Sequence, residues 1–352
     1  MILLCLMVII GGCGKSVEQQ IAEQLELGRK YLEEQNYEEA ILAFNKVIEL
    51  EPKTLGAYKG KSTAYEMQGD YVYAVSTLEQ GFELIGVEQL DSADVERLIE
   101  LYTALISEEE IQGNIEMELE YYRKILEYQP ENESAVKRYS EIETFNHYKE
   151  QIIEIMSSAS EDDTVLLEET EILDEQFDES VKDLETPIFS RVKDNLYIGV
   201  YPQGYIYYGE MKSGKREGTG LWYSRIDFSN SDSSLTSVFS GIWIDDLPNG
   251  RGYYKRAIDN KIDTQISGSY KDGLFNGTME LQSEDTVFGY GLMTYKFNAE
   301  NGHIQVIGYN HVNQQIIARI NEKHYLVNTL ETGEMGIPPF GELPWLTFYY
   351  QE

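Results

Sequence analysis

The hydrophobic residues of this chain recur with different periods in different stretches. An apolar run begins at Met1 and ends at Cys13. Over residues 16 to 150 the apolar side chains lie three and four apart, which predicts amphipathic helices. From residue 186 the period becomes two, which predicts short antiparallel strands. The sequence therefore predicts a multidomain α+β protein, with an all-α part followed by an antiparallel β part.

The helical part contains an internal repeat of about 34 residues. The repeat positions are occupied by Leu27, Gly28, Tyr31, Ala40, Phe44 and Pro52 in the first copy, and by Tyr58, Lys61, Ser62, Tyr65, Ala74 and Leu78 in the second. Each copy has small residues where two antiparallel helices would approach each other. A third copy is displaced by an insert at residues 89 to 98 and has Glu118 where a small residue belongs.

This repeat resembles the tetratricopeptide repeat (TPR), in which helix pairs form a right-handed solenoid. The resemblance implies that the first helix of each pair lines a face for a protein or peptide partner, with Leu25, Arg29, Lys59 and Thr63 on it. Arg29 and Lys59 are candidates for holding an acidic group of the partner, and Leu25 for an apolar contact. Alternatively, both cations are ordinary solvated helix charges, with Glu26 and Glu33 as local partners of Arg29. The variety of the family that binds chaperone tails needs asparagines that this face lacks.

Residues 151 to 185 form an acidic connector between the two parts. Its segment from 161 to 185 has 12 acidic residues and one basic residue, with apolar side chains on one side of a helix. It is either a solvated helix or a flexible tether, and in both cases a spacer. The ordered loop of oxygen ligands that binds Ca²⁺ is missing.

A second repeat, rich in glycine and aromatic residues, begins after residue 186. The glycine that opens each unit and the one that begins its return strand lie nine apart, at Gly209 and Gly218, Gly241 and Gly250, and Gly268 and Gly277. The pattern resembles the MORN repeat, a β-hairpin unit, and implies hairpins stacked into one twisted sheet. Met279 replaces the last glycine of the third unit. Residues 224 to 237 and 255 to 265 interrupt the array and are predicted as surface loops.

Aromatic residues recur at matching places in the hairpin units. Trp222, Trp243, Tyr254 and Tyr270 are candidates for stacking on the sugar rings of a cell-wall glycan, if one face of the sheet is exposed. The alternative is that these rings form the core stripe of the sheet, because packing also requires regular placement.

Charge and chemistry exclude several classes of function. The formal net charge of -34 disfavours nucleic acids and anionic lipid headgroups as partners. None of the 4 histidines has a metal-ligand spacing, and no nucleophile-elbow motif occurs. We therefore expect no enzyme, no metal and no cofactor.

The apolar run at the start is shorter than the ~20 residues of a membrane-spanning helix. Ile10, Gly11, Gly12 and Cys13 resemble a bacterial lipoprotein box, which implies a signal peptide over residues 1 to 13 and acylation of Cys13. The expectation is a lipid-anchored protein on the extracytoplasmic side of the cell membrane. Its helical repeats would bind a protein partner; alternatively, residues 186 to 352 bind glycan and residues 16 to 150 are a spacer.

Overall fold

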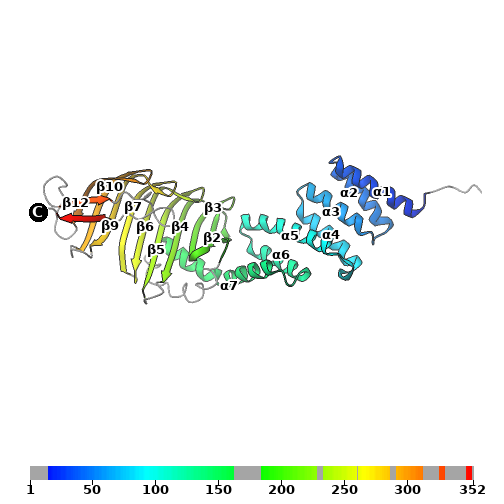
Figure 1. Ribbon diagram of the computed structural model, residues 1–352, viewed down its shortest axis with the longest axis horizontal. Coiled ribbons are helices and arrows are strands. Elements are labelled where there is room, and N and C mark those ends of the chain that lie inside the picture. The colour runs from blue at the N-terminus through cyan, green and yellow to red at the C-terminus, as the bar shows by residue number, and fades with distance from the viewer. Residues whose placement is uncertain are drawn as a thin grey trace, which may run out of the picture. The chain divides into compact units, whose positions relative to one another are not determined.

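The computed structural model describes residues 15–161, 184–227, 233–259, 261–285, 291–311, 325–329 and 346–350. Helices come first and antiparallel strands follow (Figure 1), which confirms the predicted α+β fold class. The chain divides into two compact units. The first is Met1–Glu108 with Tyr121–Asn132, and the second is Glu109–Glu120 with Glu133–Glu352.

The helical repeats comprise α1 (Val17–Glu33), α2 (Tyr37–Leu50), α3 (Leu55–Met67), α4 (Tyr71–Ile85), a short 3-10 turn η1 (Val87–Gln89), α5 (Ser92–Gln112), α6 (Ile115–Tyr128) and α7 (Glu133–Glu161). Their ends follow local chemistry. A capping box starts α1, since the hydroxyl of Ser16 accepts from the Gln19 backbone and the Gln19 side chain accepts from Ser16. At the start of α4, the carboxylate of Asp70 accepts from the backbone N–H of Tyr73 at 3.3 Å.

The first helix pair is organised around Phe44, which is buried. A Cβ added at Gly28 on α1 would lie 2.6 Å from the Phe44 ring, and one added at Gly60 on α3 would lie 2.3 Å from it. The ring therefore fits between α1 and α3 only because both helices have a glycine there. The small residue predicted at Gly28 is confirmed, whereas Gly60 was not singled out by the repeat pattern.

The second helix pair uses the small residues that the repeat predicted. Ser62 is buried and its hydroxyl donates to the carbonyl of Ala74 at 2.8 Å, which joins α3 to α4. Gly81 on α4 leaves room for Tyr58, since a Cβ there would lie 2.7 Å from the ring. The buried hydroxyl of Ser62 is therefore tolerated between α3 and α4, because a backbone carbonyl accepts its hydrogen bond.

The later helices are longer than the repeat predicts. The first turn of α5 begins at Ser92, inside the predicted insert, and α7 continues to Glu161, beyond residue 150. The start of the predicted connector is therefore helical, and residues 162 to 183 lie outside the described residues. The two compact units also divide elsewhere than at residue 150, because Glu109–Glu120 and α7 belong with the strands.

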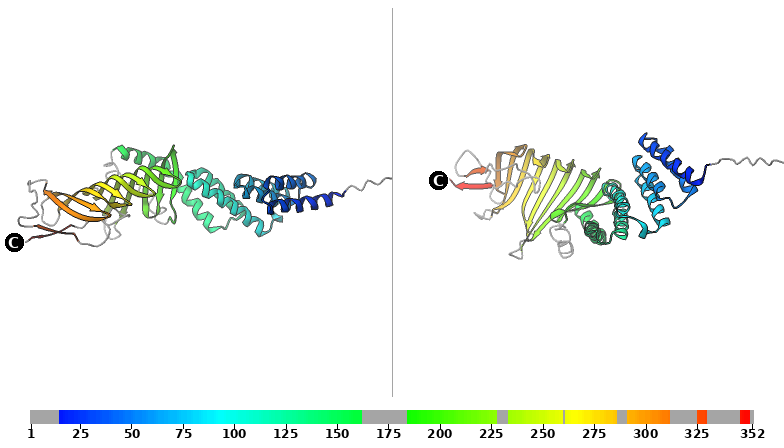
Figure 2. Two further views of the ribbon diagram at one scale, coloured as in Figure 1. Left: turned by 90° about the horizontal axis from the view of Figure 1, so that it is seen from above. Right: turned by 45° about the vertical axis from the view of Figure 1, so that its right-hand side comes forward.

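The strands are β1 (Ile188–Lys193), β2 (Leu196–Tyr201), β3 (Tyr205–Lys212), β4 (Lys215–Asp227), β5 (Ser234–Ile244), β6 (Leu247–Ile258), β7 (Lys261–Lys271), β8 (Leu274–Phe275), β9 (Gly277–Asp285), β10 (Gly291–Glu300), β11 (His303–His311), β12 (Tyr325–Thr329) and β13 (Leu346–Tyr350), with a 3-10 turn η2 (Pro202–Gly204) after β2. Strands β1 to β11 lie side by side in one antiparallel sheet (Figure 2), in chain order except that β8 pairs only with β7. Strands β12 and β13 pair with each other.

A row of glycines crosses the sheet in register. The row is Gly209, Gly220, Gly241, Gly252 and Gly268, each paired with the next on strands β3 to β7. Aromatic rings lie over it: a Cβ at Gly220 would be 2.3 Å from the Tyr207 hydroxyl oxygen, and one at Gly252 would be 2.5 Å from the Phe239 ring. The glycines of the predicted hairpin units therefore provide space for rings from adjacent strands.

The hairpins turn through two residues with positive φ, as type I′ turns require. These turn pairs are Ser213-Gly214, Asp245-Asp246, Asp272-Gly273 and Asn301-Gly302. Successive turns are bonded to one another: the Gly273 N–H donates to the Pro248 carbonyl at 2.9 Å and the Asp246 N–H to the Arg216 carbonyl at 3.2 Å. The stacking of hairpins is thus fixed at their turns as well as along their strands.

The two predicted surface loops are mostly strand, so that prediction was wrong. Residues 224–227 and 234–237 pair with each other and extend β4 and β5, and only 228–232 between them lie outside the described residues. Likewise β6 and β7 extend through Ala257 and Ile262, which pair with each other. The first stretch is rich in Ser, Asp and Asn, which suggested a loop, yet its Thr236 and Ser237 are buried in the sheet.

The edge strand β1 is paired on its outer side by a helical turn of the same unit. The Arg191 N–H donates to the carbonyl of Gly113, in the turn between α5 and α6, at 2.9 Å. Gly113 has a φ of 67°, and a Cβ there would lie 2.8 Å from the Tyr197 ring. This contact, with α7 against β1 and β3, explains why residues 109–120 belong with the sheet.

Candidate partner-binding face of the helical repeats

The face predicted to bind a partner begins on α1. Leu25 is half-buried there and packs against the core around Phe44. Arg29, one turn further along, is exposed and forms no ion pair with any described residue. Its guanidinium is available to a group from outside the chain.

The surface around Arg29 is acidic. A shallow, open hollow adjoins it and is lined, among the described residues, by α1 alone: Ala22, Glu23, Glu26, Leu27, Arg29, Lys30 and Glu33. Three of these lining residues are glutamates. Any group that reaches Arg29 therefore also meets carboxylates one turn away on either side.

Lys59, the second predicted cation, has a partner within the chain. It forms an ion pair with Asp94 of α5, whose side chain is 6% exposed, whereas that of Lys59 is 42% exposed. Thr63 is also satisfied locally, because its hydroxyl donates to the Lys59 carbonyl at 3.0 Å. An external acidic group would have to compete with Asp94 for Lys59, so Arg29 and Lys59 are not equivalent.

A second ion pair joins α3 to α5. Arg97 pairs with Glu66, and also donates to Glu100 on its own helix at 2.9 Å. The repeat pattern missed Asp94 and Arg97 because it placed the third copy after an insert that ended at residue 98. In the sequence, these two residues could be linked to the face only through their charges, which are opposite to those of Lys59 and Glu66.

A buried tyrosine connects three helices of the first unit. The Tyr102 hydroxyl donates to Glu79 of α4 at 2.6 Å, and Lys124 of α6 lies 3.7 Å from the same carboxylate oxygen. Burial and the neighbouring Glu79 raise the pKa of Tyr102 well above its usual range. Tyr102 therefore remains a neutral donor that holds α4, α5 and α6 together.

The four rings predicted as candidates for glycan stacking lie in the core of the sheet. Trp222, Trp243, Tyr254 and Tyr270 are 4%, 0%, 1% and 3% exposed. Neighbouring rings cover them: the Trp222 and Trp243 centroids are 5.8 Å apart, and those of Phe239 and Tyr270 are 5.1 Å apart. The expectation of an exposed stacking face is wrong for these residues, because each hairpin buries its rings against the next.

One cation lies among these rings. The guanidinium of Arg216 is 4.5 Å from the ring centroids of both Trp222 and Trp243. Asp246, in the turn of the next hairpin, accepts from the Arg216 Nε at 3.0 Å, and its carbonyl accepts from the Arg216 Nη2 at 2.7 Å. The two charges are paired with each other, so the arrangement joins two hairpins.

The lipidation site Cys13 and the rest of residues 1 to 14 lie outside the described residues. Within the described part of the chain, no helix has the length and apolar character needed to cross a membrane. Nor do the described residues include a group of three or more His, Cys, Asp or Glu side chains placed to hold a metal ion.

No protein-family model and no curated protein matches this chain. Among solved structures, it is similar to the first TPR of Spaghetti (RPAP3) bound to the HSP90 peptide SRMEEVD, with 22% identity and a TM-score of 0.25 over 36% of this chain and 94% of that one. It is also similar to the N-terminal domain of stress-induced protein-1 from C. elegans, with 18% identity and a TM-score of 0.29 over 37% and 99% of the two chains. A third similarity is to the TPR2AB domain of yeast Sti1 in its pHSP90 complex, with 21% identity and a TM-score of 0.30 over 44% and 57%.

Proposed function

We propose that this chain is a scaffold that binds a protein or peptide partner on the face formed by Leu25, Arg29, Lys59 and Thr63. The observation that carries the proposal is the contrast between the cations of this face. Lys59 and Arg97 are held by acidic residues of the chain, whereas Arg29 is exposed and has no such partner among the described residues. A face whose other charges are already paired loses little conformational freedom when a partner binds.

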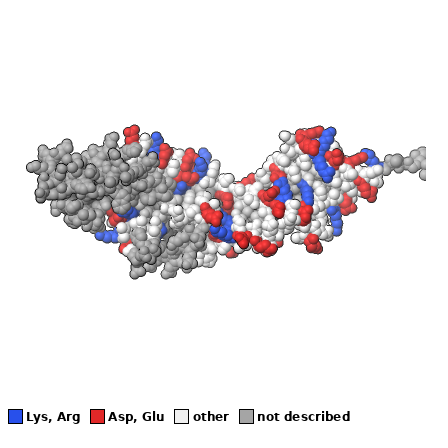
Figure 3. All heavy atoms as spheres, in the orientation of Figure 1, with Lys and Arg blue, Asp and Glu red and all other residues white. Residues whose placement is uncertain are grey.

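The chemistry of this face limits the partner. Arg29 suits a bidentate contact with a carboxylate, and Leu25 offers a partly buried apolar surface beside it. Asp and Glu side chains are spread over the helical part of the chain (Figure 3), and three glutamates line the hollow at Arg29. The partner segment that fits has one acidic group for Arg29 and basic or neutral residues around it.

The anchoring and the second module belong to the same proposal. The apolar run ending in Ile10, Gly11, Gly12 and Cys13 supports a lipoprotein anchored on the extracytoplasmic side of the cell membrane. The glycine row from Gly209 to Gly268 supports the interpretation of the hairpins as MORN repeats. In this scheme the sheet extends the scaffold, and the chain binds its partner without catalysis.

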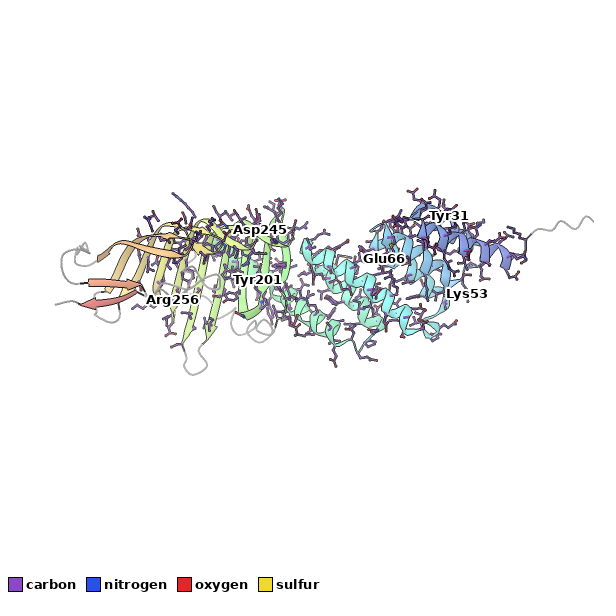
Figure 4. The ribbon with its side chains drawn as sticks, turned by 45° about the horizontal axis from the view of Figure 1, so that its top comes forward. Tyr31, Lys53, Glu66, Tyr201, Asp245 and Arg256 are labelled. Atoms are coloured by element: carbon purple, nitrogen blue, oxygen red, sulfur yellow. The ribbon has the colours of Figure 1, made fainter. Side chains whose placement is uncertain are left out.

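The test is a crosslinking pull-down from cells that express the full chain. Arg29→Glu should abolish recovery of the partner, because it puts a carboxylate in place of the cation that has no ion pair with a described residue. Lys53→Glu is the matched control: Lys53 is exposed, lies before α3, and is at the other end of that helix from Glu66 (Figure 4). Recovery of the same partner with both variants would contradict the proposed face.

Anchoring is tested separately by Cys13→Ala. The variant should move from the membrane fraction to the soluble fraction, since no acyl chain can be attached. If it stays with the membrane, the lipoprotein part of the proposal fails. The pull-down with Arg29→Glu is an independent test of the partner face.

A further inference from the structure

The sheet has a defect in its third hairpin, where the repeat departs from the first two units. In those units the opening glycine pairs across the hairpin with the last glycine of the unit: Gly209 with Gly220, and Gly241 with Gly252. In the third, the ladder between β7 and β9 ends at the pair of Ser267 and Glu280. Met279 stands where the last glycine would be, and a Cβ on Gly268 would lie 2.3 Å from its sulfur. The methionine therefore fills the space over Gly268, and β7 resumes its pairing with β8, at Tyr270 and Phe275.

A groove of about 550 Å³ lies at this place, within the ~300–1,000 Å³ range of small-molecule sites. It is lined by Arg251, Gly252, Ser267, Gly268, Ser269, Thr278, Met279 and Glu280. The side chains along it are mostly polar, which distinguishes it from the aromatic face of the same strands. A polar groove of this size suits a ligand that forms several hydrogen bonds.

Arg251 and two serines provide unused donors on this surface. Arg251 is exposed and forms no ion pair with a described residue, and the hydroxyls of Ser267 and Ser269 form no hydrogen bond with one. Arg251 pairs directly with Ser269 across β6 and β7, so their side chains lie on the same face. Ser267 follows two residues away on that face. The three donors therefore converge on one stretch of the groove.

The remaining polar groups differ along the groove. Lys271 is exposed and lies two residues beyond Ser269 on the same face, which adds positive charge near Arg251. Glu280 pairs with Ser267 on the other side of β7, where its carboxylate accepts from Gln282 at 3.4 Å. One end of the groove thus favours an anion, whereas the other end offers an acceptor for hydroxyl groups.

We infer that this groove binds a small polyhydroxylated acid, such as a uronic acid. Its carboxylate lies against the guanidinium of Arg251 and the hydroxyl of Ser269, and its sugar hydroxyls lie toward Ser267 and Glu280. The charge of the region permits an anion, because residues 186 to 352 have 19 acidic and 14 basic residues, in contrast to the strongly acidic helical part. The inference is independent of the partner face on α1, α3 and α5.

Ligand-observed NMR with the full chain tests the site, with glucuronate as the probe and glucose as its neutral match. Glucuronate should bind saturably and glucose should not. Arg251→Gln should weaken glucuronate binding by about tenfold or more, because it removes a charged hydrogen-bond donor pair. The paired change Ser267→Ala with Ser269→Ala should weaken it less.

The control is Lys212→Gln, which removes one exposed positive charge on β3 and leaves the groove intact. It should bind glucuronate as the unaltered chain does. A second variant, Ser269→Leu, fills the groove while keeping Arg251, and should also abolish binding. Equal binding of glucose and glucuronate, unchanged binding in Arg251→Gln, or an equal loss in Lys212→Gln would overturn the inference.

Discussion

One carboxylate oxygen of Asp246 accepts hydrogen bonds from both the backbone N–H and the side-chain Nε of Arg216, at 2.8 and 3.0 Å. The corresponding turn residue in the other two hairpin units is a glycine, Gly214 or Gly273. Asp246 has a φ of 68°, a conformation that glycine adopts at lower cost. The aspartate is therefore present for its carboxylate, which neutralises the guanidinium of Arg216, a residue that is 6% exposed and lies among aromatic rings.

Asp246→Gly should destabilise the sheet although it restores the turn glycine. The gain from relieving the positive φ is smaller than the loss of hydrogen bonds to a charged group, so we expect a net cost of roughly 2 kcal/mol in the free energy of unfolding. Chemical denaturation measures it. Asp245→Gly is the control, since Asp245 also has a positive φ but only an exposed pair with Lys215. Equal stability of the two variants would contradict the role of Asp246.

Gly60→Ala should destabilise the helical repeats. Its Cβ would lie 2.3 Å from the buried ring of Phe44, and overpacking of this kind costs about 1–3 kcal/mol. On the same helix, Gly56 has no atom within 4 Å of an added Cβ. Gly56→Ala should therefore stabilise by roughly 0.5–1 kcal/mol through helix propensity. The two melting temperatures should move in opposite directions, and a common direction would argue against the fit of Phe44 between the helices.

The difference between these glycines shows what the sequence could and could not predict. Gly28 was predicted because it occupies a repeat position with a known packing role. Gly60 lies at no such position, and its function depends on a ring from another helix, which only the folded chain brings near. Periodicity therefore predicted the helix pairs and the hairpins, while the contacts between successive repeats remained hidden.

The candidate sites follow the same division. The exposed position of Arg29 and the half-buried position of Leu25 follow from the period of the first helix alone. The neutralisation of Lys59 by Asp94 does not, because it depends on how far α5 extends into the apparent insert. The rings of Trp222 and Trp243 were identified correctly as a repeating stripe, but alternation alone does not show what covers a face of a sheet.

Gly113→Ala should loosen the contact between the α5–α6 turn and the edge strand. The φ of 67° costs a non-glycine residue roughly 1–2 kcal/mol, and the new Cβ would also lie 2.9 Å from the Arg191 nitrogen. Hydrogen exchange of the Arg191 amide should accelerate, because its acceptor is the Gly113 carbonyl. Gly69→Ala shares the positive φ, at 79°, but an added Cβ meets nothing within 4 Å. Gly69→Ala should leave the Arg191 amide protected. If hydrogen exchange of this amide accelerates equally in both variants, the loss of the contact with Gly113 is not its cause.

Glu118 should make stability depend on pH. It occupies the place of a small residue in the third repeat and is 2% exposed. Burial, and next the charge of Glu110, raise the pKa of Glu118 to about 8 from a usual value of 4.5. The native state therefore retains a proton that the unfolded chain loses above that usual value.

It follows that the contribution of Glu118 falls as pH rises from about 4.5 to about 8, by up to ~1.4 kcal/mol per pH unit, and is constant above that range. Glu118→Gln keeps the shape of the side chain without the charge, so its unfolding free energy should lack this decline and exceed that of the unaltered chain at pH 8. Urea denaturation at pH 5, 6, 7 and 8 measures the difference between the two curves. Glu39→Gln changes an exposed position on α2, and its unfolding free energy should depend on pH as that of the unaltered chain does. If the Glu118→Gln curve is parallel as well, the carboxyl group is ionised in the native state. The positive charge of Arg138, which favours the ionised form of Glu118, must then compensate for its burial.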